Sequence, residues 1–79
     1  MKKEEVVYKA ISEILEVSVE RLKKTKNLSE IELWDSLNQL NILIKLNTMF
    51  KNKVSSITKM AKADSVKKII KLLRDNKLI

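Results

Sequence analysis

The side chains of this 79-residue chain that could do chemistry are limited to hydroxyls, amines and carboxylates. Cysteine and histidine are absent, which excludes disulfides, thiolate or imidazole metal sites, cysteine nucleophiles and Ser-His-Asp arrangements. Glycine is absent too, which excludes a glycine loop that cradles phosphate. No nucleophile and base pair is evident among the remaining residues, so we expect that the protein is not an enzyme.

One local feature has chemical content, the pair Asp35-Ser36 at the start of a predicted helix. Asp is a favoured N-cap residue, and the pair taken alone is typical of helix capping. A hydroxyl at position 36 would be exposed, and a phosphate attached to it would lie near the unpaired amides and the positive dipole end of the helix. The pair therefore predicts a cap, or a cap beside an attachment point for a phosphodiester.

The elements that must position this pair follow from hydrophobic periodicity. Apolar residues at helical spacing predict a helix over about residues 3–16, a second over about 36–50 and a last one after the cap Asp64-Ser65. Ser55 and Ser56 are expected to cap a short helical piece through Lys62. Its expected packing residues are Val54, Ile57, Met60 and Ala61. No segment shows strand alternation, so we predict an all-α fold, a small four-helix bundle with three long helices and one short helix.

Residues 17–33 are predicted to form a long loop between the first and second helices, within which Ser18 caps a short turn through Leu22. Loops of this length tend to be functional or to be held by apolar anchors. The expected anchors are Leu22, Leu28 and Leu33. A chain of this size has room for one core, so residues 1–79 are predicted to be a single domain.

The apolar positions of the predicted 36–50 helix form two rows. The expected core row contains Leu43, Leu46 and Phe50. The second row starts at the N-terminus of the helix and contains Leu37, Leu40 and Ile44. If the second row is exposed it marks a contact surface, and if it is buried it only widens the core face; the periodicity leaves both open.

The formal net charge of +7 is distributed unevenly along the chain. Residues 1–35 hold seven basic and eight acidic side chains, whereas residues 36–79 hold ten basic and two acidic ones. The longest apolar runs are far shorter than the roughly 20 residues that cross a bilayer, and the N-terminus has no apolar stretch typical of a signal peptide. We therefore expect a cytoplasmic protein without a membrane span.

The segment LWDSLNQLNILIKL (residues 33–46), followed by Phe50, resembles the phosphopantetheine attachment region of acyl carrier proteins. In that family an Asp-Ser-Leu triplet opens the second helix, aliphatic residues recur at these spacings, and a Phe closes the helix. An amphipathic first helix, a long loop, a short third helix and a Val-containing last helix extend the resemblance over nearly the whole chain.

The resemblance implies that a phosphopantetheinyl transferase, using coenzyme A and magnesium, attaches 4'-phosphopantetheine to Ser36. Asp35 would cap the helix and lie near the transferase's metal, while Leu37, Leu40 and Ile44 would face partner enzymes. The thiol arm would carry an acyl or aminoacyl thioester, as in lipid or secondary metabolite biosynthesis. Acyl chains would be sheltered by interior residues that otherwise only pack the core: Leu43, Leu46, Val54, Ala63 and Ile70.

The chain departs from the family pattern before and after the triplet. Trp34 stands where many members have a small residue; Trp occurs in some stand-alone carriers, including D-alanyl carriers, that work with adenylate-forming ligases. The second helix of typical fatty-acid carriers is acidic, whereas polar and basic residues occupy it here, and these would be repelled by a basic docking patch. We expect a specialised monomeric carrier whose partners are an acyl- or aminoacyl-adenylating ligase and downstream transferases.

Two alternatives remain open at the level of sequence. One is a small basic helical module that binds nucleic acid or an anionic membrane through the Lys-rich C-terminal half. The few aromatic residues and the lack of helix-turn-helix spacing argue against sequence-specific reading of bases, so a nucleic-acid partner is not expected. The chain could also keep the carrier fold as a structural bundle that is never modified. Neither the carried group nor the role of the basic half follows from the residues.

Overall fold

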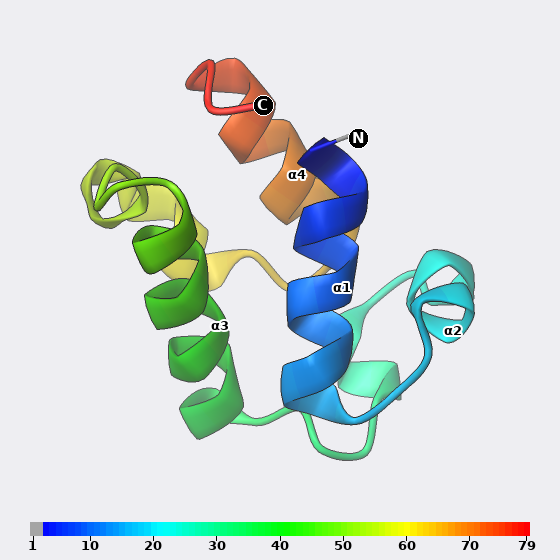
Figure 1. Cartoon of the computed structure of the whole chain (residues 1–79). Coiled ribbons are helices and arrows are strands. Elements are labelled where there is room, and N and C mark those ends of the chain that lie inside the picture. The colour runs from blue at the N-terminus through cyan, green and yellow to red at the C-terminus, as the bar shows by residue number, and fades with distance from the viewer. Residues whose placement is uncertain (1–2) are drawn as a thin grey trace.

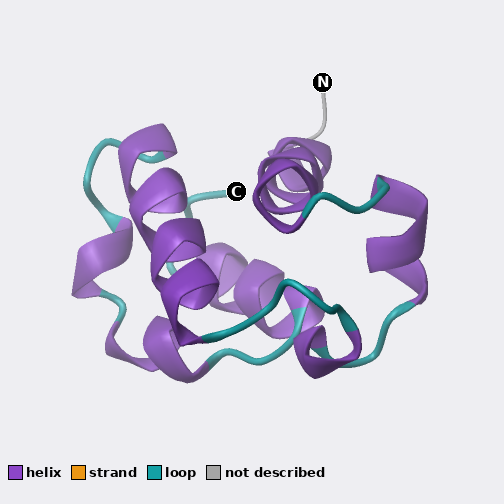
Figure 2. Cartoon of the chain, turned by 90° about the horizontal axis from the view of Figure 1, so that it is seen from below, coloured by secondary structure: helices purple, strands orange, loops and turns teal. Residues whose placement is uncertain are grey.

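The computed structural model describes residues 3–79, and this part of the chain contains four α-helices and three short 3-10 helices (Figure 1). The α-helices are α1 (Lys3–Leu15), α2 (Val19–Lys24), α3 (Ser36–Met49) and α4 (Val66–Asp75). The 3-10 helices are η1 (Leu28–Glu30), η2 (Val54–Ser56) and η3 (Thr58–Lys62). Residues 3–79 contain no strand, as Figure 2 shows. The prediction of an all-helical small bundle is confirmed for these residues.

The place of the short helix differs from the prediction. Segment 54–62 forms the 3-10 helices η2 and η3, and neither has a side-chain cap; the hydroxyls of Ser55 and Ser56 instead donate back to the carbonyls of Asn52 and Lys53. The predicted capping role of the two serines is therefore wrong, and Ala61 is exposed. The short α-helix of the bundle is α2, inside the segment predicted as a loop, where Ser18 caps it as expected.

One cluster of buried apolar side chains joins the helices, and it includes residues from every α-helix. α1 packs against both α3 and α4, and Figure 2 looks almost along its axis. The fully buried residues of the three longer helices recur at helical spacing: Val7, Ile11, Leu15, Ile42, Leu46, Ile69 and Leu73. Among the helices of residues 3–79, none combines the length and the apolar character that crossing a membrane requires.

The loop between α1 and α3 is held against the start of α4. The backbone amide of Leu28 donates to the carbonyl of Asp64 at 2.7 Å, and the Asn27 side chain donates to the Asp64 carboxylate at 3.2 Å. Leu22, Leu28 and Ile31 are buried, whereas Leu33 is 42% exposed. Leu22 and Leu28 are thus anchors as predicted, but the third anchor is Ile31 and not Leu33.

The three longer helices end in the same way although the chain has no glycine. Glu16, Lys51 and Lys77, which follow α1, α3 and α4, have φ values of 54°, 55° and 61°. In each case the next amide bonds a carbonyl five residues earlier, which is the hydrogen bond of the Schellman motif. A non-glycine residue in this left-handed region costs roughly 1–2 kcal/mol. Charged side chains therefore occupy positions where glycine is favoured.

Candidate functional site

Ser36 is the first residue of α3 and its side chain is exposed. The preceding Asp35 has an extended backbone, and its carboxylate accepts a hydrogen bond from the Asn38 amide at 2.8 Å. Asp35 is therefore the N-cap that the sequence predicted. The amides of Ser36 and Leu37 have no carbonyl within the helix to bond, so they remain at the positive dipole end, beside the serine hydroxyl.

The start of α3 is fixed to the rest of the bundle by Gln39, a buried polar residue. Its side-chain oxygen accepts a hydrogen bond from the Trp34 indole at 2.9 Å, and its side-chain nitrogen donates to the carbonyls of Ala63, at 3.0 Å, and Met60, at 3.4 Å. Asn38 also donates to the carbonyl of Leu33 at 2.6 Å. The triplet Asp35-Ser36-Leu37 is thereby held between a tryptophan anchor and the η3 segment.

The second apolar row of α3 is exposed. The exposed fractions of Leu37, Leu40 and Ile44 are 66%, 52% and 55%, whereas Ile42, only two residues before Ile44, is fully buried. These three side chains, together with Leu33, are the large apolar residues that the described part of the chain exposes. We call Leu37, Leu40 and Ile44 the α3 ridge. An apolar stripe of this kind on a small protein often marks a contact surface.

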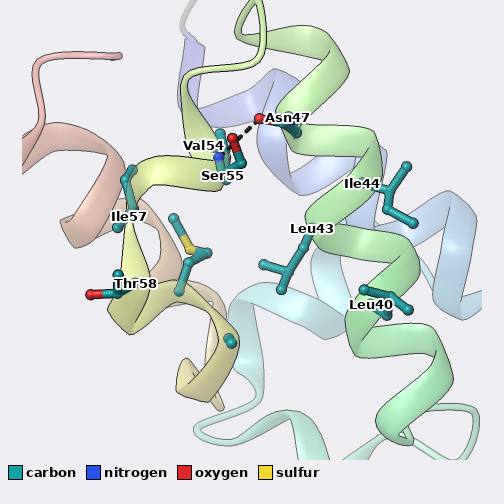
Figure 3. A pocket seen from close by; sticks show the side chains of 10 residues that line it. Leu40, Leu43, Ile44, Asn47, Val54, Ser55, Ile57 and Thr58 are labelled. Atoms are coloured by element: carbon teal, nitrogen blue, oxygen red, sulfur yellow. Dashed lines mark hydrogen bonds between the residues drawn. The ribbon is translucent and has the colours of Figure 1, made fainter.

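A groove of about 290 Å³ lies beside the ridge, between α3 and the segment of η2 and η3 (Figure 3). Leu43 points from α3 toward this segment, and the Asn47 side chain accepts a hydrogen bond from the Ser55 amide at 2.9 Å (Figure 3). The groove is lined by no charged residue. Its lining is mostly aliphatic, and it begins at Leu40, one turn along α3 from the Ser36 hydroxyl.

The core row of α3 differs in part from the predicted one. Leu46 is buried, but Leu43 and Phe50 are only half-buried, and the fully buried partner of Leu46 is Ile42. Ile42 and Leu46 are four residues apart and so lie on one face of a helix, a spacing from which their shared burial could have been predicted. Of the five residues expected to line an acyl interior, Leu43 and Val54 line the groove, and the other three are buried in the core cluster.

The α3 surface carries almost no net charge. Lys45 is the one charged residue between Ser36 and Met49, and its amine lies 2.8 Å from the Glu13 carboxylate of α1. The hydrogen bond from Lys45, together with its charge, holds the pKa of Glu13 below its usual value. Residues 3–79 contain no group of three or more acidic side chains placed to hold a metal ion.

Comparison with known proteins found no match: no protein-family model, no curated protein and no solved structure matches the chain.

Proposed function

We propose that the protein is an acyl carrier protein in which Ser36 bears 4'-phosphopantetheine. The observation that supports this most directly is the exposed Ser36 hydroxyl at the capped N-terminus of α3, one helical turn from an uncharged aliphatic groove. The hydroxyl oxygen would bond the phosphorus of the pantetheine phosphate of coenzyme A. Adenosine 3',5'-bisphosphate would leave, and the hydroxyl proton would pass to the transferase.

The residues around Ser36 fit such a group. The new phosphodiester would carry one negative charge beside the unpaired amides of Ser36 and Leu37, which favour an anion at this end of a helix. The arm would extend along the aliphatic groove that begins at Leu40, where its thioester cargo meets no charged side chain. When bound, the group supplies the thiol that this cysteine-free chain lacks.

The proposed partners are those that the resemblance to acyl carrier proteins implies, and the α3 ridge is the surface on which they would dock. A phosphopantetheinyl transferase would modify Ser36, and an acyl- or aminoacyl-adenylating ligase and downstream transferases would dock over Leu37, Leu40 and Ile44. Because Lys45 is paired with Glu13, this docking would rest on apolar contact and would change little with salt. A docking face that is strongly basic and salt-sensitive would contradict this part of the proposal.

The decisive experiment is mass measurement after incubation with coenzyme A, magnesium and a broad-specificity phosphopantetheinyl transferase. The wild type should gain the mass of one phosphopantetheinyl group, and Ser36→Ala should gain none. Ser29→Ala is the matched control, because Ser29 is another exposed hydroxyl in a helical turn and its variant should be modified like the wild type. An unmodified, folded wild type would overturn the proposal in favour of a purely structural bundle.

The reading of the chain as a basic module for nucleic acid or anionic membrane stays a prediction from charge. Salt-sensitive retardation of duplex DNA by the Ser36→Ala variant would support it, because that protein keeps every lysine but has lost the proposed attachment point.

A further inference from the structure

A second hollow, of about 540 Å³, lies at the end of the bundle where α3 and α4 finish and α1 begins. In Figure 1 these helix ends lie toward the top, whereas α3 starts at the bottom, and Ser36 is its first residue. The helix has 14 residues, so the two places are about 20 Å apart along its axis. The hollow is therefore separate from the groove beside Ser36, and its chemistry differs.

Four lysines line this hollow, and no acidic residue does. They are Lys3, Lys51, Lys53 and Lys77. Within residues 3–79 the ion pairs are those of Lys45, Lys68 and Arg74, so none of the four lysines has a carboxylate partner. Like charges so placed repel one another, and an anion bound among them would relieve the repulsion.

The remaining lining is apolar: Val6, Met49, Phe50 and Leu78. These side chains are half-buried, in contrast to the exposed α3 ridge. They line a recess and do not project as residues that insert into a bilayer would. A volume of this size lies within the range of about 300–1,000 Å³ that small-molecule sites occupy.

Backbone geometry holds two of the lysines at the hollow. Lys51 and Lys77 occupy the left-handed positions after α3 and α4, and the turns they make return the chain over the helix ends. The Leu78 amide then bonds the carbonyl of Leu73 at 2.9 Å, which brings the Leu78 side chain into the lining. Two helix terminations with the same geometry therefore deliver both charge and apolar surface to one site.

From these observations we propose that the hollow binds a single-chain amphiphile with an anionic headgroup, a carboxylate or a phosphate. The chain of the amphiphile lies on Val6, Met49, Phe50 and Leu78, and its headgroup is bound by the lysines at the rim. The site needs no modification of Ser36, so it does not depend on the proposed carrier function.

The test follows methionine methyl groups by NMR while monomeric decanoate is added. Met49 lines the hollow and Met60 is buried in the core, so one protein holds both the probe and its internal control. The Met49→Leu variant assigns the signal. We expect decanoate to shift the Met49 methyl resonance and to leave Met60 and the Trp34 indole unchanged. Butyrate, which has the same headgroup and too short a chain, should shift Met49 far less.

The charge requirement is tested with the double variant Lys51→Asn/Lys77→Asn. Asparagine tolerates the left-handed conformation, so the fold should be kept. Loss of two exposed lysine contacts should raise the Kd for decanoate about fivefold. Lys67→Asn/Lys71→Asn removes the same charge from exposed positions of α4 outside the hollow and should leave the Kd unchanged. Uncharged decyl maltoside should bind the wild type at least about fivefold more weakly than decanoate.

Three results would overturn the proposal. The Met49 signal could stay unmoved by decanoate, the two double variants could weaken binding equally, or the methyl of Met60, which also lines the groove near Ser36, could shift as strongly as Met49, which would place the amphiphile in that groove. Sedimentation with phosphatidylglycerol vesicles separates the membrane as source: pelleting of the protein without any response of Met49 to monomeric decanoate would assign the lysines to bilayer docking instead.

Discussion

Replacing Gln39 by leucine removes the polar link between the start of α3 and η3 while keeping a side chain of similar size. The wild-type amide makes two short hydrogen bonds, at 2.9 Å to the Trp34 indole and at 3.0 Å to the Ala63 carbonyl. Each is worth about 1 kcal/mol net, and the contact to Met60 at 3.4 Å adds little. We therefore expect Gln39→Leu to lower the free energy of unfolding by about 2 kcal/mol, or the melting temperature by roughly 8–16 °C.

Urea unfolding followed by far-UV circular dichroism measures this loss without relying on the tryptophan that the variant disturbs. Asn41→Leu is the matched control, since it makes the same amide-to-leucine change on the exposed face of the same helix. Asn41 donates only to the Asn38 side chain, in a hydrogen bond that is exposed to solvent, so its variant should stay within about 0.5 kcal/mol of the wild type. Hydrogen exchange at the Trp34 indole should also accelerate in Gln39→Leu.

An unchanged or raised urea midpoint for Gln39→Leu would refute this reasoning. It would mean that apolar packing of leucine replaces the hydrogen bonds in full, as happens at some buried polar sites. The Gln39 hydrogen bonds would then not be needed to position the start of α3.

Three further outcomes test the assignment of core, helix ends and surface charge. Ile44→Ala should cost less than about 1 kcal/mol of stability, whereas Ile42→Ala should cost about 2–5 kcal/mol; equal losses in urea unfolding would place the ridge in the core. Glu16→Gly should raise the melting temperature by a few degrees, a gain of about 0.5–1 kcal/mol, and a decrease would argue against left-handed strain there. The hydrogen bond from Lys68 holds the pKa of the Asp64 carboxyl below its value in the unfolded chain. The ionised carboxylate therefore stabilises the fold above about pH 4, and this contribution is lost as the pH falls further. Asp64→Asn should make the urea midpoint fall less between neutral and acid pH.

Local sequence patterns predict the three longer helices and the residues that cap the helices. The three longer helices carry sustained apolar periodicity, and the capping roles of Ser18, Asp35 and Ser65 follow from residue type alone. α2 is different, because six residues are too few to be stable as an isolated helix. Its existence depends on burial of Leu22 in the core, which is a tertiary contact.

The parts that local patterns miss depend on contacts between distant residues. Gln39 reads as a surface residue of an amphipathic helix, but the carbonyls it bonds lie 21 and 24 residues further along the chain. The choice of Ile31 over Leu33 as the third anchor likewise depends on where the loop meets α4. At the candidate site, residue types predicted Asp35 as the cap, while the groove beside it required the packing of η2 and η3 against α3.

The distribution of charge bears on how such a carrier would find its partners. The chain has a formal net charge of +7, yet the one charged residue of α3 is paired, so the ridge itself exerts little long-range force. The unpaired lysines of the second hollow lie at the opposite end of α3 from Ser36. The exposed lysines Lys59 and Lys62 lie near the start of α3, beside the Met60 and Ala63 carbonyls that Gln39 bonds. Lysines therefore lie toward both ends of α3, and long-range attraction to an acidic partner would not single out the end that holds Ser36. A partner that acts at Ser36 must then rely on short-range apolar contact, and its association rate should fall within the range of unsteered encounters, about 10⁵–10⁶ M⁻¹s⁻¹.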